Sequence, residues 1–129
     1  MEEKYLSEEE LKVEKNYLHN KKKFVSLRKR IDFLFVRDNG FSHQGEFVIL
    51  NYLQKKAVKT RIGFTVTKKM GSATKRNYIK RLIRAILIKN QSKIPDNFDM
   101  EIVPKKQFCE IKFTKVESDI LDLLKRIKI

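Results

Sequence analysis

Apolar and polar positions recur along the chain with two periods, which predict helices and strands respectively. A period near 3.6 predicts a helix whose apolar stripe faces a core. The stripe is clearest in residues 73–89, where the apolar positions fall at i, i+3, i+4, i+7 and i+8: Ile79, Leu82, Ile83, Ile86 and Leu87. Weaker stripes predict helices at 30–38, ended by Asn39 and Gly40, and at 114–127.

Segments rich in β-branched and aromatic residues predict strands at 46–53, 61–67 and 99–103. Residues 55–60 are a short connection, so we expect the first two strands to form an antiparallel pair. A loop at 68–72 precedes the long helix. No repeat or low-complexity linker divides the chain, which predicts one α/β (α+β) domain at 23–129 and a charged N-terminal extension at 1–22, either a weak helix or a disordered tail.

The charge of the chain indicates its binding partner rather than its fold. The 129 residues include 30 Lys and Arg against 16 Asp and Glu, a formal net charge of +14. Residues 1–19 hold six Glu and three Lys, so the rest of the chain carries +17. Residues 47–95 contain thirteen Lys or Arg and no acid. A solvated face mixes both signs, so a stretch of one sign points to a polyanion, with nucleic acid ahead of a membrane surface or an acidic protein.

The cations concentrate on one side of the long helix. At about 100° per residue, Arg76, Asn77, Lys80, Arg81 and Arg84 fall within an arc of about 140°, opposite the apolar stripe. An Arg fork holds two phosphate oxygens at once, and Asn donates to and accepts from a base edge or a 2′-hydroxyl. Three lysines lie just before or at the start of this helix: Lys68, Lys69 and Lys75.

Two other interpretations of this helix fit the sequence less well. A merely solvated helix would carry acids for i,i+4 pairing, and this one has none. A membrane-surface helix would need its apolar side for lipid, whereas here the core needs it, and no Trp or Phe lies on it. Among nearby aromatic residues, Phe33 and Tyr78 are candidates to stack on bases, the alternative being that they belong to the core.

The basic region lacks the groups that hydrolysis requires. Residues 47–95 contain no Asp, Glu, His or Cys, so they offer no acid–base pair, nucleophile or metal ligand, and no P-loop is present. The single Cys109 excludes an intramolecular disulfide, and no apolar run is long enough to cross a bilayer. We therefore expect a cytoplasmic RNA-binding protein that does no chemistry alone.

The run RIGFTVTKKMGSATKRNYIKRLIRAI at 61–86 resembles the signature of the bacterial ribonuclease P protein component. That family has a strand ending in a basic doublet, a Gly turn and a helix of the form R-N-R-x-K-R-x-x-R. DFLFVRDNG resembles its first helix, EFVIL the strand after it, and FDMEIVPKK its last strand, so the resemblance covers 24–127. Tyr78 departs from the pattern, because the family usually has Arg there.

The resemblance implies a ribosomal protein S5 domain 2-like fold of order αβββαβα, with a left-handed βαβ crossover. It also implies a protein subunit that binds ribonuclease P RNA and the 5′ leader of precursor tRNA, and assists endonucleolytic removal of that leader. Hydrolysis would belong to the RNA subunit with its Mg²⁺, while the protein would hold no metal or other cofactor. Neither DNA nor a membrane is an expected partner.

Two groups of site residues follow, and none of them is expected to be catalytic. The expected RNA-binding residues are Arg61, Lys68, Lys69, Lys75, Arg76, Asn77, Tyr78, Lys80, Arg81 and Arg84. The expected cleft for the single-stranded leader, between the first helix and the sheet, is lined by Phe33, Arg37, Phe47 and Leu50. Arg37 stands where family members often have an aromatic residue, which leaves Phe33 as the stacking residue.

Two competing hypotheses stay open. A ribosomal protein or RNA chaperone would share the charge pattern without needing this helix motif. A self-sufficient nuclease would need the acid–base set that the basic region lacks.

Overall fold

The computed structural model of the chain describes residues 23–56, 58–106 and 113–127, so the predictions for the N-terminal extension and for Cys109 concern residues outside it. The described strands form one mixed sheet in the order β1-β4-β5-β3-β2. Their bounds are β1 Val25–Ser26, β2 Phe41–Gln44, β3 Val48–Gln54, β4 Arg61–Phe64 and β5 Phe98–Pro104.

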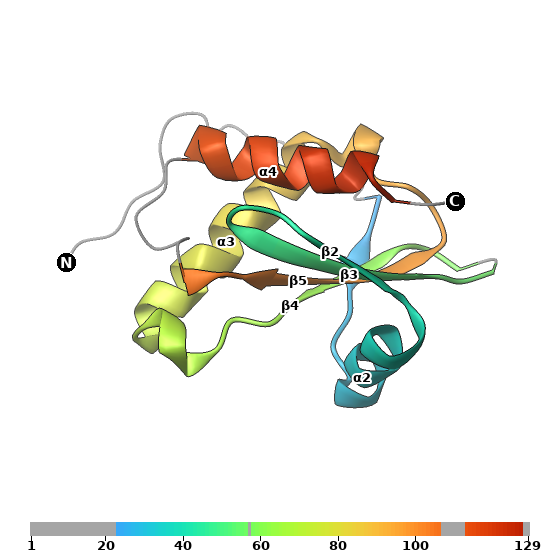
Figure 1. Cartoon of the computed structure of the whole chain (residues 1–129), viewed down its shortest axis with the longest axis horizontal. Helices are drawn as coiled ribbons and strands as arrows, with labels where there is room; N and C mark the ends of the chain where they lie inside the picture. The colour runs from blue at the N-terminus through green and yellow to red at the C-terminus, as the bar shows by residue number, and fades with distance from the viewer. Residues whose placement is uncertain (1–22, 57, 107–112, 128–129) are drawn as a thin grey trace.

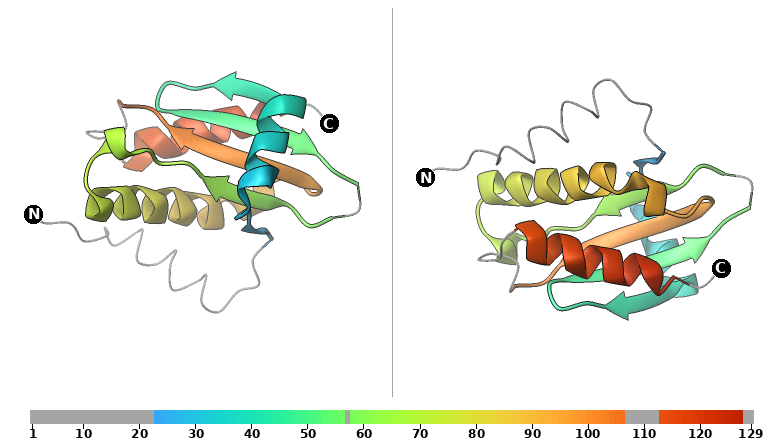
Figure 2. Two further views of the ribbon diagram at one scale, coloured as in Figure 1. Left: turned by 90° about the horizontal axis from the view of Figure 1, so that it is seen from below. Right: turned by 90° about the horizontal axis from the view of Figure 1, so that it is seen from above.

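Helices cover both faces of this sheet (Figures 1 and 2). The long helix α3 (Ala73–Lys89) and the C-terminal helix α4 (Phe113–Lys125) lie on one face, and α2 (Arg30–Asn39) crosses the other. Short 3-10 turns, η1 (Lys68–Met70) and η2 (Gln91–Lys93), flank α3. The sheet therefore presents two different faces, one packed against two helices and one only partly covered by α2.

Strand β5 occupies the middle of the sheet, which corrects the expected pairing of β3 with β4. It pairs antiparallel with β3 and parallel with β4, so it lies between them. The physical reason is burial: β5 is buried at every position except the half-buried Val103, and a strand buried on both faces takes a central place. Residues 55–60 then connect β3 to β4 past the end of β5, over roughly 10 Å, about two strand spacings.

Most elements confirm the sequence pattern. Helix α3 has the predicted bounds, and β2 supplies the third strand that the αβββαβα order requires. The residue pattern missed β2 because its four residues are mostly exposed, and it missed the two-residue β1 altogether. The hand of the β4-α3-β5 crossover stays a prediction.

The core lies between the sheet and the α3–α4 layer. All five residues of the predicted apolar stripe on α3 are at most 2% exposed, and Ala85 and Ile88 are buried as well. Each fully buried aliphatic side chain stabilises the fold by about 1.5–3 kcal/mol. The apolar side of α3 is thus fixed in the core. The opposite side of the helix, which carries the cations, faces away from that core.

Candidate nucleic-acid interface

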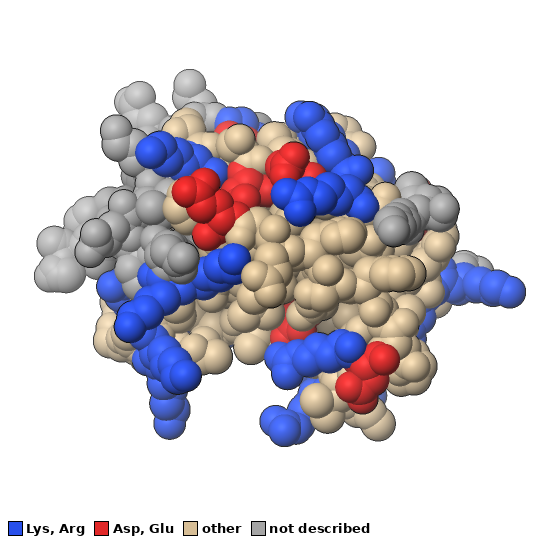
Figure 3. Space-filling view, in the orientation of Figure 1, with Lys and Arg blue, Asp and Glu red and all other residues tan. Residues whose placement is uncertain are grey.

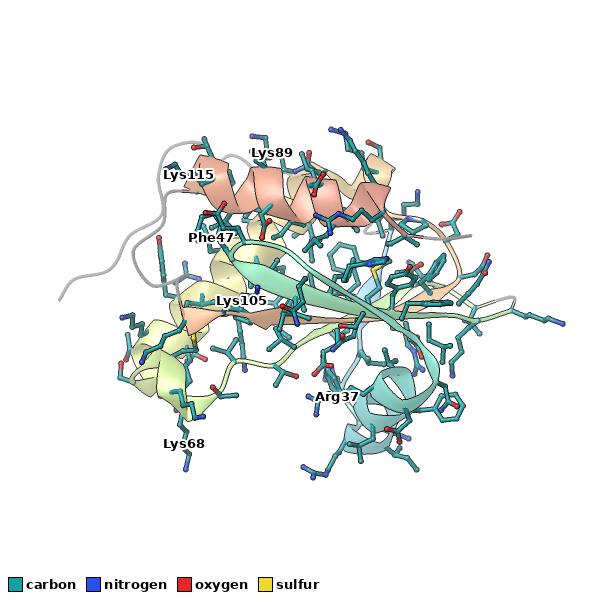
Figure 4. The ribbon with its side chains drawn as sticks, viewed as in Figure 1. Arg37, Phe47, Lys68, Lys89, Lys105 and Lys115 are labelled. Atoms are coloured by element: carbon teal, nitrogen blue, oxygen red, sulfur yellow. The ribbon has the colours of Figure 1, made fainter. Side chains whose placement is uncertain are left out.

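A tight turn sets where α3 begins. Gly71 has φ of 123°, a conformation that suits glycine, and its N–H donates to the Lys68 carbonyl at 3.1 Å. Ser72 follows as the N-cap, and its hydroxyl accepts a hydrogen bond from the Lys75 N–H at 3.2 Å. Met70 is buried, while Lys68 and Lys69 are exposed. The turn therefore fixes two lysines at the start of the helix, and Lys68 projects away from the domain (Figure 4).

Three cations of α3 form a line along the helix, at i, i+4 and i+8. Arg76, Lys80 and Arg84 are all half-buried, and we call them the basic row. The Arg84 guanidinium lies 5.3 Å from the centre of the Phe64 ring, which places this row beside β4. Among the described residues, no carboxylate forms an ion pair with any of the three. Within the described part of the chain, no acidic side chain neutralises the row.

The remaining predicted residues of this helix surround the row. Lys75, Asn77 and Arg81 are exposed. Figure 3 shows Lys and Arg side chains gathered over η1 and the start of α3, whereas α4 carries both signs. We call η1 and the exposed side of α3 together the basic surface: Lys68, Lys69, Lys75, Arg76, Asn77, Lys80, Arg81 and Arg84.

Tyr78 lies on the side of α3 away from the basic row. Its ring is half-buried and packs against the core cluster. Two residues along a helix turn the side chain by about 200°, so Tyr78 points away from Arg76. Part of the ring is therefore occupied by core packing, and the expected stacking role of Tyr78 stays a prediction.

Arg61 is also separated from the basic surface, because it lies on the sheet face that α2 crosses. Its Nε and Nη2 donate to the two carboxylate oxygens of Asp99 at 2.8 and 2.7 Å. Its Nη1 lies 3.5 Å from Asp32 of α2. Asp99 is only 1% exposed and also lies 3.5 Å from the Lys55 amine. Arg61 is thus paired with a buried carboxylate, unlike the three cations of the basic row.

A second buried carboxylate lies two residues further along β5. Glu101 is fully buried, and it accepts hydrogen bonds from Arg37 Nε at 2.9 Å, Arg37 Nη2, the Asn51 amide at 2.9 Å and the Thr65 hydroxyl. Burial raises the pKa of the Glu101 carboxyl, but the hydrogen bonds from Arg37, Thr65 and Asn51 outweigh it and hold the pKa below its usual value. The carboxylate is therefore charged and fully satisfied.

These groups define a polar patch beneath α2, which we call the α2-side face: Phe33, Arg37, Asn51, Arg61, Thr65, Asp99 and Glu101. Its two carboxylates, Asp99 and Glu101, were not among the predicted site residues. The signal was present, because Asp99 and Glu101 alternate with Phe98, Met100 and Ile102, and residues two apart on a strand share a face. Two acids on one face of an apolar strand indicate buried ion pairs.

The expected leader cleft is only half assembled by the fold. Phe33 packs over Gly63, where a Cβ would lie 2.3 Å from the Phe33 ring, and Arg37 reaches β5 from the same helix. Leu50 alternates with Asn51 and is buried in the core on the opposite face. Phe47 lies beside α4, where its N–H donates to Asp119 at 2.8 Å (Figure 4). The inclusion of Phe47 and Leu50 in a shared cleft with Phe33 was therefore wrong.

Within the described residues, no three His, Cys, Asp or Glu side chains lie together as metal ligands would. None of the described helices combines the length and apolarity needed to traverse a bilayer. What the site does offer is a rigid, one-signed row of cations on one side and neutralised arginines under α2 on the other.

Known proteins resemble this chain in both fold and sequence. The Ribonuclease P family model matches residues 21–128. The ribonuclease P protein component of Fusobacterium nucleatum is 35% identical over 108 residues, which cover 81% of this chain and 97% of the relative. The solved ribonuclease P protein of Thermotoga maritima superposes with a TM-score of 0.75 at 35% identity, over 81% of this chain and 98% of that one.

The Staphylococcus aureus ribonuclease P protein, at 24% identity, shares the fold with a TM-score of 0.71 over 81% of this chain and 94% of its own. The sequence match extends over the basic surface as well as the core, since it runs from before β1 to the end of α4. The chain therefore belongs to the ribonuclease P protein family, which acts in tRNA processing.

Proposed function

We propose that this chain is the protein subunit of a ribonuclease P ribonucleoprotein, and that it binds both the catalytic RNA and the 5′ leader of precursor tRNA. The observation that carries the proposal is the basic row, whose three cations lie on a rigid helix without carboxylate partners among the described residues. Cations in this state release counterions from RNA when they contact phosphates, and that release supplies affinity.

In this assembly the protein binds RNA and the RNA subunit carries out hydrolysis. The basic surface docks on the folded catalytic RNA, where regular phosphate spacing suits a line of Arg and Lys. The α2-side face, with Phe33 and Arg37, meets the single-stranded leader. Hydrolysis, with the Mg²⁺ that it needs, is assigned to the RNA subunit.

A reconstitution tests this assignment. The catalytic RNA of the same organism is mixed with precursor tRNA at low Mg²⁺, with and without the full-length protein, and 5′ cleavage is followed with an end-labelled substrate. We expect the protein to stimulate cleavage by the RNA and to cleave nothing alone. The matched control is mature tRNA, which lacks the leader and should bind the holoenzyme more weakly than the precursor.

Each other outcome selects a competing hypothesis. Cleavage by the protein alone would make it a nuclease in its own right. RNA binding without any effect on the ribozyme would favour a ribosomal protein or an RNA chaperone.

A further inference from the structure

Arg37 is held by an unusually complete set of contacts for a side chain at the surface. Its side chain is 44% exposed, yet two of its nitrogens donate to a carboxylate that is fully buried. Glu101 is itself fixed by the Asn51 amide and the Thr65 hydroxyl. Helix α2, strands β3 and β5 and the residue that follows β4 therefore meet at this carboxylate, so Arg37 has little freedom to change its direction.

The geometry decides which donors of Arg37 remain. A guanidinium carries five N–H groups. The Nε–H and one Nη2–H point to the two oxygens of Glu101, so the bonds run along the side edge of the guanidinium plane. The end edge, made of the second Nη2–H and one Nη1–H, has no partner in these contacts. It presents two parallel donors.

The net charge of the Arg37–Glu101 pair indicates which kind of ligand the two remaining donors suit. Glu101 neutralises Arg37, so the pair adds little long-range attraction for phosphate, unlike the basic row. Fixed donors instead contribute directional selectivity, because they lose little conformational entropy on binding. Guanine is the base that presents two adjacent acceptors, O6 and N7, to such an edge. In a single-stranded leader, that base edge is reachable.

We propose that Arg37, positioned by Glu101, recognises the O6 and N7 edge of a guanine in the single-stranded 5′ leader. Arg37 is the contacting residue, and Glu101 is a positioning residue that acts through it. The inference rests on the proposed function, because it assumes that the leader reaches the α2-side face.

The neighbouring pair shows why Arg37, rather than Arg61, takes this role. Arg61 makes the same side-edge contact with Asp99, but its Nη1 lies 3.5 Å from Asp32. Its end edge therefore faces a second carboxylate of the protein. Only the Arg37 edge is left for a ligand within this described patch.

The test uses the reconstituted holoenzyme and precursor tRNA with a randomised leader, and sequencing of the cleaved fraction gives relative kcat/KM for each leader. The wild-type protein should favour guanine at one leader position by about tenfold. Arg37→Lys keeps the charge and the pairing with Glu101 but lacks the fork, so it should abolish this preference. Glu101→Gln should reduce this preference, because an amide offers Arg37 only one acceptor oxygen.

The matched control is Arg126→Lys, since Arg126 also pairs with a carboxylate, Asp122 of α4 at 2.7 Å, but directly follows α4 at the other face of the sheet. It should leave the guanine preference intact. At the preferred position, 7-deazaguanine, which lacks N7, should lose most of the advantage that guanine has over adenine.

A preference that survives Arg37→Lys, or no guanine preference in the wild-type holoenzyme, would overturn the inference while leaving the proposed function standing. Failure of the wild-type protein to stimulate cleavage at all would instead overturn the proposed function. Because Arg37→Lys changes only a half-exposed side chain, it tests the proposal even if Glu101→Gln unfolds the domain.

Discussion

Arginine occurs in two opposite settings in this domain. In the basic row, Arg76 and Arg84 flank Lys80, and none of the three pairs with a carboxylate among the described residues. On the α2-side face, Arg37 and Arg61 are each held by a buried carboxylate of β5. The residue type is the same, but the first pair carries net charge and the second carries almost none.

The two settings therefore serve different purposes: the basic row supplies affinity for RNA, and the paired arginines fix the direction of hydrogen-bond donors. Uncompensated cations attract RNA over about 10 Å at moderate salt, and their contribution falls as salt rises. Arginines paired with a carboxylate stabilise the fold and present hydrogen-bond donors in a fixed direction. Salt changes their contribution to RNA binding much less. Variants in the two regions should therefore fail in different assays, and four predictions test that separation.

The largest effect is expected from Glu101→Ala on stability. The change removes the acceptor for Arg37, Asn51 and Thr65 and leaves a cavity in the central strand. We expect the free energy of unfolding to fall by about 3 kcal/mol, the low end for a broken buried pair because Arg37 can rehydrate. Urea unfolding measures it. The double variant Glu101→Val with Arg37→Met should recover most of the loss, and no recovery would mean that packing rather than pairing dominates.

The next effect concerns RNA affinity. Arg76→Ala and Lys80→Ala should each weaken binding to the catalytic RNA by about tenfold, which corresponds to roughly 1.5 kcal/mol for a charge-assisted contact. Each should also make the slope of log K against log salt shallower by about one unit. Lys125→Ala, an exposed lysine on α4, is the control. An unchanged slope would show that the row does not face phosphate. The free energy of unfolding of Arg76→Ala and Lys80→Ala should change by less than about 0.5 kcal/mol.

Acid should weaken the contacts of Glu101 on the α2-side face. Hydrogen bonds hold the folded pKa of Glu101 below its ordinary value of 4.5 despite burial, so its contribution is present above about pH 4.5 and is lost as pH falls through the folded pKa. Below about pH 4.5, the free energy of unfolding should change less steeply with pH in Glu101→Gln than in the wild-type protein, by at most about 1.4 kcal/mol per pH unit. Parallel acid-unfolding curves of the two proteins would contradict this assignment.

The smallest effect is expected at the start of α3. Ser72→Ala removes the hydroxyl that caps the helix and should cost about 1 kcal/mol in stability. Since the cations remain, the salt slope of RNA binding should not change. A change in slope would mean that the turn itself contacts RNA.

Local patterns predicted α3 well and the sheet poorly, for a physical reason. The bounds of α3 follow from its apolar stripe, the Ser72 cap and the turn at Gly71, all of which are read within one segment. Strand pairing depends on a partner that can lie anywhere in the chain. Nothing in residues 46–67 shows that β5, more than thirty residues later, separates β3 from β4.

The same limit applied to the site. The cations of the basic row were found because one helix carries them all. Leu50 was misplaced because the face to which a strand residue points depends on register, which a one-residue slip inverts. Glu101 was missed because its partners Arg37, Asn51 and Thr65 come from three other elements or their ends.

The central position of β5 also has a consequence for synthesis of the chain. Until residue 104 has left the ribosome, β3 and β4 lack the strand that joins them, so β4 with β1 remains detached from the β2–β3 hairpin. The basic helix is made before β5, and its apolar stripe has no finished sheet to cover. Sheet formation therefore depends on late, long-range contacts, which slow folding and leave apolar surface exposed in the nascent chain.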